Sequence, residues 1–235
     1  MNRDIFIRNL TKGKVEMHPT GRNANDISPE EFEQMYESFF NMILNIAATD
    51  IAGETGYGEF DENNRAEYVT CEEFIRETFN QEREGYWKNW EEMFETTFLT
   101  REYFEEMLGN ALKYVKYCEG HRYLVNNNTF LCNMLVDESG RPACGDWGRA
   151  GIMDFMMDFA IMDLNKPYLL IPEKLYEYAK RKGLDIPDFK ERFLCMAYFK
   201  GIDTLRWHAS IDDLESCESI TRSLNELAER LERLG

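Results

Sequence analysis

Residues 124–137 read LVNNNTFLCNMLVD, and residues 145–160 read GDWGRAGIMDFMMDFA. The first segment begins and ends with short runs of β-prone residues, and the turn at 137–141 leads to a third predicted strand that ends at Asp146. The chain on both sides of these segments has apolar residues at helical spacing. The chain is therefore expected to contain helices, then a small β region rich in Asn and Asp, and then helices again. This order is unusual, so it narrows the set of folds that the chain could adopt.

Helix-capping residues and apolar spacing predict most of the other elements. The sequence SPEE at 28–31 is a capping box with proline at the first helical position, which predicts a helix over about 29–48. Further helices are expected from Thr70, over about 86–97 and 101–118, from Pro172, from Pro187, and over about 211–233. Residues 50–68 are rich in Gly, Asn and Asp and are expected to form a loop.

The first residues of the chain are expected to differ from the helical remainder. The apolar alternation at 4–8, the Gly-containing turn at 11–14 and the apolar residues at 15–17 predict one β-hairpin. The expected organisation is therefore a short hairpin over residues 1–27 and a helical domain over residues 28–235. The expected fold class is mainly α with a small β-hairpin region.

The composition limits the classes of function. A hydrophobic fraction of 43% supports a buried core, and a net charge of −17 opposes nucleic-acid binding, which depends on Lys and Arg. The same charge could attract a cationic small molecule or a basic protein surface, or it could only solvate helix surfaces. No apolar run approaches the roughly 20 residues of a membrane span, so no membrane contact is expected. Six scattered cysteines without a CxxC pair, and no signal peptide, indicate reduced thiols in a cytoplasmic protein.

The two quoted segments resemble the motifs of the aminoglycoside phosphotransferase family, the small-molecule kinases that include hygromycin and macrolide kinases. The family pattern is roughly L-V-H-G-D-x-x-x-x-N-x-L, a short hairpin, I-D-W, and then G-D-P-x-x-D-L-A. By this resemblance, Asn133 falls at the magnesium-binding Asn and Asp146 at the metal-binding Asp. Asp154 and Asp158 fall at two aspartates that have structural roles in the family.

The resemblance continues outside the motif segments. GYGEFD at 56–61 and TCEEF at 70–74 resemble a loop and helix of the family, and the likeness covers about residues 25–230. It implies a protein-kinase-like fold, of which this chain resembles the helical C-lobe. Working kinases of the family place roughly 80 to 100 residues of sheet, with a phosphate-covering loop and a Lys, before the hinge. Only about 27 residues precede the first family-like helix here, so most of the N-lobe is expected to be missing.

The motif itself departs from the family at its catalytic residue. The family's His-Gly-Asp is Asn126-Asn127-Asn128 in this chain. The Asp accepts or orients the proton of the acceptor hydroxyl, whereas the amide of Asn128 could hold a hydroxyl but not act as a base. Asn133 and Asp146 alone would make a weak magnesium site, or they could be residual scaffold residues. No cofactor is therefore expected, and Asn128→Asp alone is not expected to restore turnover.

Two further groups of residues leave alternatives open. Tyr86, Trp87 and Trp90 could form an aromatic binding shelf, or they could pack in the core. The three histidines lack a neighbouring Cys or His at metal-binding spacing and are expected to be structural or surface residues: His18, His121 and His208.

Three functions follow from these observations. The leading expectation is a degenerate, pseudokinase-like phosphotransferase that is not an enzyme and binds a protein partner or a cationic small molecule. The second is an ATP- and magnesium-dependent phosphotransferase of an aminoglycoside-like molecule, with its nucleotide lobe supplied in trans or by oligomerisation. The third is a regulatory interaction protein that uses the fold as a scaffold. A C-lobe without its N-lobe exposes a face of order 600 to 1,500 Å², which a second copy or another protein would cover.

Overall fold

Nine helices and seven short strands make up the described part of the chain, residues 3–16, 19–51 and 53–234 of a computed structural model. The helices are α1 (Arg3–Leu10), α2 (Pro29–Ala47), α3 (Cys71–Thr78), α4 (Met93–Thr96), α5 (Arg101–Tyr114), α6 (Met156–Asn165), α7 (Ile171–Lys182), α8 (Phe189–Ser210) and α9 (Leu214–Glu232). The strands are β1 (Arg22–Asn23), β2 (Tyr57–Phe60), β3 (Ala66–Tyr68), β4 (Tyr123–Val125), β5 (Met134–Val136), β6 (Pro142–Cys144) and β7 (Gly151–Met153). Met17 and His18, at the end of the predicted hairpin, lie outside the described residues.

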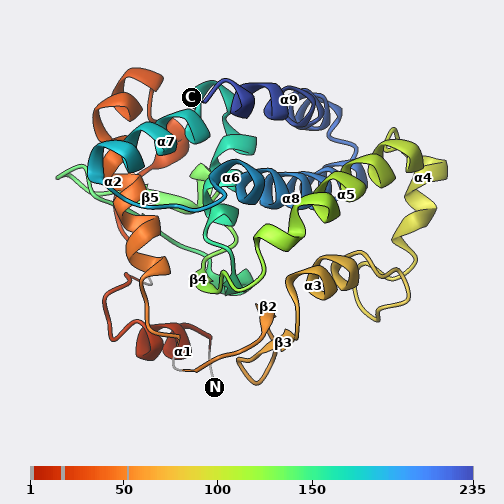
Figure 1. Cartoon of the computed structure of the whole chain (residues 1–235), viewed down its shortest axis with the longest axis horizontal. Helices are drawn as coiled ribbons and strands as arrows, with labels where there is room; N and C mark the ends of the chain where they lie inside the picture. The colour runs from red at the N-terminus through yellow and green to blue at the C-terminus, as the bar shows by residue number, and fades with distance from the viewer. Residues whose placement is uncertain (1–2, 17–18, 52, 235) are drawn as a thin grey trace.

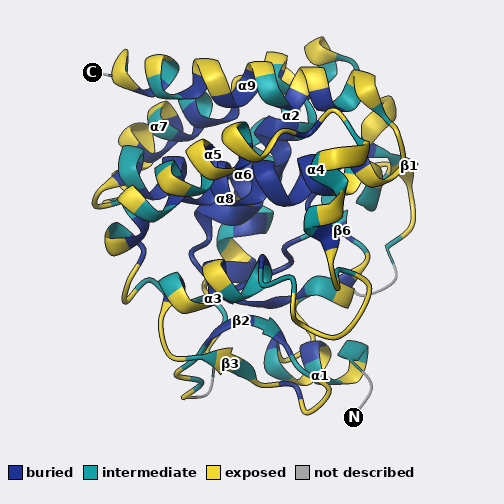
Figure 2. Ribbon diagram, turned by 90° about the vertical axis from the view of Figure 1, so that its right-hand side faces the viewer, coloured by how far each residue is buried: buried dark blue, intermediate teal, exposed yellow. Residues whose placement is uncertain are grey.

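Helix α8 lies at the centre of the helical part of the molecule. Every residue from Arg192 to Arg206 is buried. The helix packs against α5, α6 and α9, which lie beside it in Figure 1. Figure 2 shows buried residues concentrated around α6 and α8, whereas α9 presents exposed residues to the outside. Because α8 has almost no solvent face, each charged side chain on it needs a partner inside the protein.

Two small antiparallel sheets bring the motif segments together. One sheet has the strand order β1-β5-β6, and the other has the order β3-β2-β7-β4. Val125 of β4 pairs with Gly151 of β7, and Met134 of β5 pairs with Cys144 of β6. The loop between β4 and β5 therefore lies beside the turn between β6 and β7.

Several sequence predictions are confirmed. The Ser28 hydroxyl accepts a hydrogen bond from the Glu31 N–H, and a complete capping box opens α2. Thr70 and Thr100 cap α3 and α5 through the same kind of side-chain contact. Strands β4 and β5 coincide with the β-prone runs, and the chain is mainly helical with small antiparallel sheets, as expected.

The predicted hairpin within residues 1–27 is wrong, because α1 occupies most of its first strand. Ile7 is fully buried and Phe6 packs against the core, while Ile5 is 55% exposed. The Phe6 ring packs edge-on against Phe60 of β2, with 5.0 Å between the ring centroids. The apolar residues of this segment are compatible with a short helix as well as with a strand. Contacts with β2 favour the helix.

Two other predicted segments are also corrected. Residues 50–68, expected to be a loop, contain the antiparallel strands β2 and β3. Glycine is needed where β2 approaches β7, because a Cβ on Gly151 would lie 2.2 Å from the backbone oxygen of Gly58. The helix expected over 86–97 is reduced to a 3-10 turn and α4, since Asn89 adopts a left-handed φ of 57° before them.

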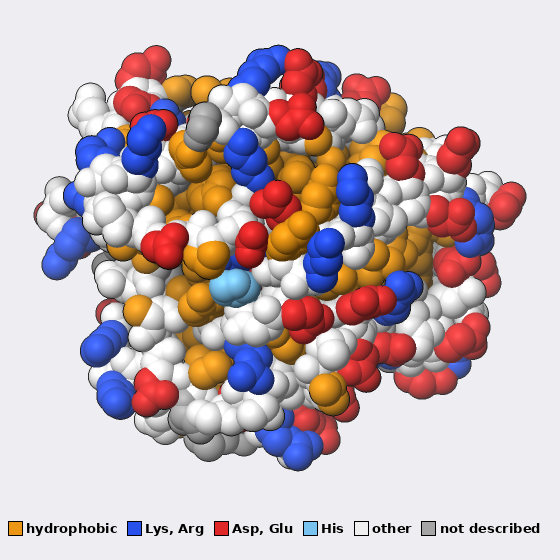
Figure 3. Space-filling view, viewed as in Figure 1, with side chains coloured by type: hydrophobic (Ala, Val, Ile, Leu, Met, Phe, Trp, Pro, Cys, Tyr) orange, Lys and Arg blue, Asp and Glu red, His pale blue; other side chains and the backbone are white. Residues whose placement is uncertain are grey.

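The face shown in Figure 3 has an apolar middle and a charged periphery. Hydrophobic side chains gather around a hollow in the middle, and acidic side chains are frequent on the side where α4 and α5 lie. Five of the six cysteines are buried, as expected, and Cys132 is exposed. No helix in the described ranges is long and apolar enough to cross a membrane.

Candidate functional site

Asp158, in the first turn of α6, holds the backbone of the loop that follows β4. Its carboxylate oxygens accept hydrogen bonds from the N–H groups of Asn126 at 3.0 Å and Asn127 at 2.8 Å. The Thr129 hydroxyl donates to the backbone oxygen of Asp158 at 2.7 Å. Burial raises the pKa of Asp158 to about 6, although the two N–H donors act in the opposite direction. Asp158 thus has the structural role that the resemblance implied.

Asp154 anchors the end of β7 to α8. Arg192 donates from Nε to Asp154 Oδ2 at 2.7 Å and from Nη2 to Oδ1 at 2.9 Å. The two side chains are only 1% and 0% exposed, so this two-point ion pair lies in the core. Met156 N–H donates a further hydrogen bond of 3.0 Å to Asp154 Oδ1. Asp154 therefore also has the structural role that the resemblance implied.

The three residues predicted to form the site, Asn128, Asn133 and Asp146, lie together. Asn128 Nδ2 donates a hydrogen bond of 2.7 Å to Asp146 Oδ2, and Asn133 Nδ2 donates one of 3.1 Å to the backbone oxygen of Asn128. Asp146 adopts a left-handed φ of 46°, and its backbone oxygen accepts a hydrogen bond from Asn126 Nδ2 at 3.4 Å. One carboxylate oxygen of Asp146 is therefore occupied by an amide N–H.

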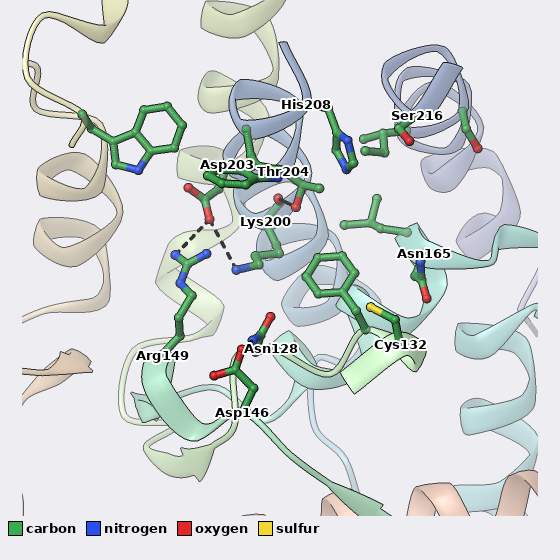
Figure 4. A pocket seen from close by; sticks show the side chains of 16 residues that line it. Asn128, Cys132, Asp146, Arg149, Asn165, Lys200, Asp203, Thr204, His208 and Ser216 are labelled. Carbon is green, nitrogen blue, oxygen red and sulfur yellow. Dashed lines mark hydrogen bonds and ion pairs between the residues drawn. The ribbon is translucent and has the colours of Figure 1, made fainter. Parts of the chain in front are cut away.

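Asn128 and Asp146 lie at one end of a cavity of about 650 Å³ (Figure 4). Figure 4 shows α8 crossing the cavity wall, with His208 and Ser216 toward the other end. The remaining lining combines apolar or aromatic residues, including Phe130, with polar and charged ones. The volume lies within the range of about 300 to 1,000 Å³ that is common for small-molecule sites.

A charged cluster forms the floor of this cavity. Asp203 on α8 accepts hydrogen bonds from Arg149 at 3.1 Å, Lys200 at 3.3 Å and Arg206 at 2.8 Å. Glu59 of β2 forms a second ion pair with Arg149, at 2.7 Å. Burial alone would raise the pKa of Asp203, but the three cations, Arg149 first, hold it well below its usual range. Burial lowers the pKa of Lys200 to about 8, with repulsion from Arg149 as the next cause.

Aromatic rings form another part of the cavity wall. Trp87 and Trp207 both line the cavity, with 6.5 Å between their ring centroids. Arg206 lies over the Trp87 ring at 4.0 Å from its centroid. Trp90, in contrast, is buried and donates from its ring nitrogen to the backbone oxygen of Phe79 at 3.0 Å. Core packing therefore applies to Trp90, whereas Trp87 faces the cavity, as a binding shelf would require.

Comparison with known proteins identifies the fold. Neither a model of a protein family nor a curated protein matches the sequence. A thermostable mutant of the aminoglycoside phosphotransferase APH(4)-Ia, in complex with ADP and hygromycin B, matches with a TM-score of 0.73 at 17% identity, over 97% of this chain and 82% of that chain. This chain has the aminoglycoside phosphotransferase fold. Choline kinase LicA from Streptococcus pneumoniae shares it, with a TM-score of 0.57 at 13% identity over 97% of this chain and 80% of that chain.

By the resemblance, Asn133 and Asp146 would hold a magnesium ion, but the two residues make a weak site for it, because the Asn128 amide already occupies one carboxylate oxygen of Asp146. Magnesium requires near-octahedral coordination by hard oxygen atoms, commonly with one or two carboxylates. Here Asp146 is the one carboxylate of the pair, and one of its oxygens already accepts the Asn128 amide. Among the described residues, no group of three or more His, Cys, Asp or Glu could hold a metal ion.

The charged floor of the cavity was not predicted from the sequence. Lys200, Asp203 and Arg206 follow one another at a spacing of three residues within the buried helix α8. That spacing puts them on one face of the helix, and charged residues in an otherwise apolar run are a signal of buried pairing. Their partner Arg149 is more than 50 residues away in the chain, so no local pattern indicates it.

The histidines have ordinary partners. His121 Nδ1 lies 3.4 Å from the Tyr123 hydroxyl, and His208 Nδ1 lies 2.9 Å from Asp213 Oδ2. The expectation of structural roles is confirmed for these two residues, although His208 also lines the cavity. His18 lies outside the described residues.

Proposed function

We propose that this chain is a non-catalytic protein of the aminoglycoside phosphotransferase fold that binds a small molecule in the cavity beside Asn128. The observation that carries the proposal is the 2.7 Å hydrogen bond from Asn128 Nδ2 to Asp146 Oδ2. A side-chain amide is not basic, so Asn128 cannot take the proton of an acceptor hydroxyl. The same hydrogen bond occupies a carboxylate oxygen that phosphoryl transfer would need for a metal ion.

The cavity supports binding even though the catalytic base is replaced. Its volume of about 650 Å³ suits a small organic molecule, and its wall combines aromatic rings with a few convergent polar groups. A cationic ligand was expected from the net charge of the chain. The cavity itself is not predominantly acidic, because its lining contains two carboxylates, Asp146 and Asp203, and two cations, Arg149 and Lys200. The net charge of the whole protein therefore does not support a cationic ligand at this place.

Thermal unfolding with Mg-ATP tests the proposed loss of catalysis. We expect Tm to stay unchanged on addition of Mg-ATP, because Asn128, Asn133 and Asp146 do not provide a metal site. A ligand at 100 times its dissociation constant would stabilise the fold by about 2.7 kcal/mol, which raises Tm by roughly 5 to 10 °C for a protein of this size. Incubation with labelled ATP and hygromycin B should likewise leave hygromycin B unmodified.

A rise in Tm with Mg-ATP that Asp146→Ala abolishes would overturn this proposal, and so would transfer of phosphate to hygromycin B. The matched control is Asp185→Ala, which removes an exposed carboxylate from the segment between α7 and α8. That control should behave like the unchanged protein in both assays.

A further inference from the structure

Arg149 and Lys200 meet at the end of the cavity where Asn128 lies. Figure 4 shows Arg149 rising from the turn that follows Asp146, while Lys200 comes from α8 and Asp203 lies beside both. Asp203 Oδ2 accepts from Arg149 Nη2 at 3.1 Å and from Lys200 Nζ at 3.3 Å. A single carboxylate oxygen thus separates two cations that face the same cavity.

The cluster around Asp203 has more positive than negative charge. The ion-pair partners of Arg149, Lys200 and Arg206 are two carboxylates, Asp203 and Glu59. Two ion-pairing carboxylates for three cations leave room for a further negative charge, although the buried Asp158 also attracts Lys200 electrostatically. An anion that enters the cavity would supply this charge at the partly exposed Arg149.

Arg149 retains hydrogen-bonding capacity toward the cavity, whereas the three N–H donors of Lys200 already have three acceptors, one on Asp203 and two on Asn127. The Arg149 side chain is 41% exposed, and its hydrogen bonds to Glu59 and Asp203 come from Nε and Nη2. Within the part of the chain that the structure describes, Arg149 Nη1 has no partner. Lys200 makes long contacts of 3.2 and 3.4 Å with the side-chain and backbone oxygens of Asn127, which an anion could replace at shorter distance.

Asp146 is the other carboxylate of the cavity, and its contacts direct it away from these cations. Its two carboxylate oxygens accept hydrogen bonds from Asn128 Nδ2 at 2.7 Å and from the Gly148 N–H at 3.4 Å. It forms no ion pair with Arg149 or Lys200, whose acidic partners are Glu59 and Asp203. The positive floor of the cavity is therefore not neutralised by Asp146.

We propose that Arg149 and Lys200 bind an anionic group of the small molecule, a carboxylate or a phosphate, at the floor of this cavity. The proposal rests on the proposed function in placing a small-molecule ligand in the cavity, and it makes that ligand an anion instead of a polycation. The anionic group lies on the cavity side of Arg149 and Lys200, because the Asp203 carboxylate occupies the space between them. The body of the ligand extends along Trp87 and Trp207. Charge-assisted hydrogen bonds from a guanidinium and an ammonium group supply the specificity for an oxyanion.

Titration of the full chain with sodium phosphate and, separately, with sodium acetate tests this site. Tryptophan fluorescence is a suitable signal, because Trp87 and Trp207 line the cavity. Sodium chloride keeps the ionic strength constant, so that general screening does not contribute. We expect a saturable change with at least one of the two anions, and the stronger of the two identifies the group as a phosphate or a carboxylate.

Arg149→Gln should weaken this binding by about 10-fold or more, since a charge-assisted hydrogen bond is lost. Arg181→Gln is the matched control, because Arg181 forms an exposed ion pair with Glu37 outside the cavity. The Arg181→Gln variant should bind the anion as tightly as the unchanged protein does. Lys200→Met is a second variant, and its far-UV circular dichroism shows whether it is folded before its expected loss of binding is measured.

The anion site is overturned if neither phosphate nor acetate gives a saturable change, or if Arg149→Gln binds as the unchanged protein does. These outcomes can be distinguished from those of the Mg-ATP experiment, because Arg149→Gln tests the anion site and Asp146→Ala tests metal-dependent nucleotide binding. Anion binding together with phosphate transfer would contradict the non-catalytic function and leave the anion site standing, and the absence of both would contradict the anion site alone.

Discussion

Asp203→Asn is expected to lower the free energy of unfolding by about 3 to 5 kcal/mol. Asp203 is the shared ion-pair partner of Arg149, Lys200 and Arg206, and two of these three cations are only 1% exposed. Asparagine keeps the size and one hydrogen-bond acceptor but removes the negative charge. The cations would then repel one another in a region of low dielectric, with only Glu59 left to compensate Arg149.

Urea unfolding followed by circular dichroism measures this effect. Asp185→Asn is the matched control, because Asp185 is exposed and a substitution there should change stability by less than about 0.5 kcal/mol. A loss below about 1 kcal/mol in Asp203→Asn would show that the cluster is compensated by groups other than Asp203. That result would also remove the charge argument for the anion site.

Arg192→Met is expected to cost a similar amount, about 3 to 5 kcal/mol. Methionine fills much of the volume of arginine, so the main change is that Asp154 loses the ion pair with Arg192 in a site where it is 0% exposed. The remaining hydrogen bond from the Met156 N–H, at 3.0 Å, cannot replace a two-point ion pair. Asp154 lies between the end of β7 and the start of α6, so loss of its ion pair also loosens the support of α6.

The same urea experiment compares Arg192→Met with Arg181→Met. Arg181 forms an exposed ion pair with Glu37, whose loss should cost no more than about 1 kcal/mol. Equal destabilisation of the two variants would contradict the view that burial of the Asp154 pair makes it important. A large loss in Arg192→Met alone is the result that we expect.

The elements that could be predicted from the sequence are those with local signals. Ser28 and Thr70 predict the starts of α2 and α3, and in the structure both side chains cap these helices. The chain at 1–27 and the loop at 50–68 were predicted wrongly, because distant contacts determine them. Phe6 packs on Phe60, and Gly151 of β7 allows β7 to approach β2. Short alternating segments and Gly-rich segments have no unique local structure, so tertiary packing decides them.

Only the part of the candidate site that has a local sequence signal could be predicted. Asn128, Asn133 and Asp146 could be selected by motif spacing, and the pairing of β4 with β7 and of β5 with β6 brings them together. The cationic floor could not be predicted in this way, since Arg149 meets Lys200 and Asp203 only through the fold. The net charge of −17 suggested a cationic ligand, whereas the cavity lining has as many cations as carboxylates, and the anion that we propose would contact Arg149 and Lys200. The net charge of the protein says little about the charge inside one cavity when most of the acidic residues of the protein lie on its surface.

Isothermal titration of Mg²⁺ into the unchanged protein and into Asn128→Asp tests the central claim most directly. The claim is that the amide of Asn128 both replaces the base and closes the metal site at Asp146, through a hydrogen bond of 2.7 Å. We predict no saturable magnesium binding by the unchanged protein. In Asn128→Asp two carboxylates would face each other at this distance, so the variant should be less stable without metal and should gain both magnesium binding and a magnesium-dependent rise in Tm. Saturable magnesium binding by the unchanged protein that Asp146→Ala abolishes would contradict the claim.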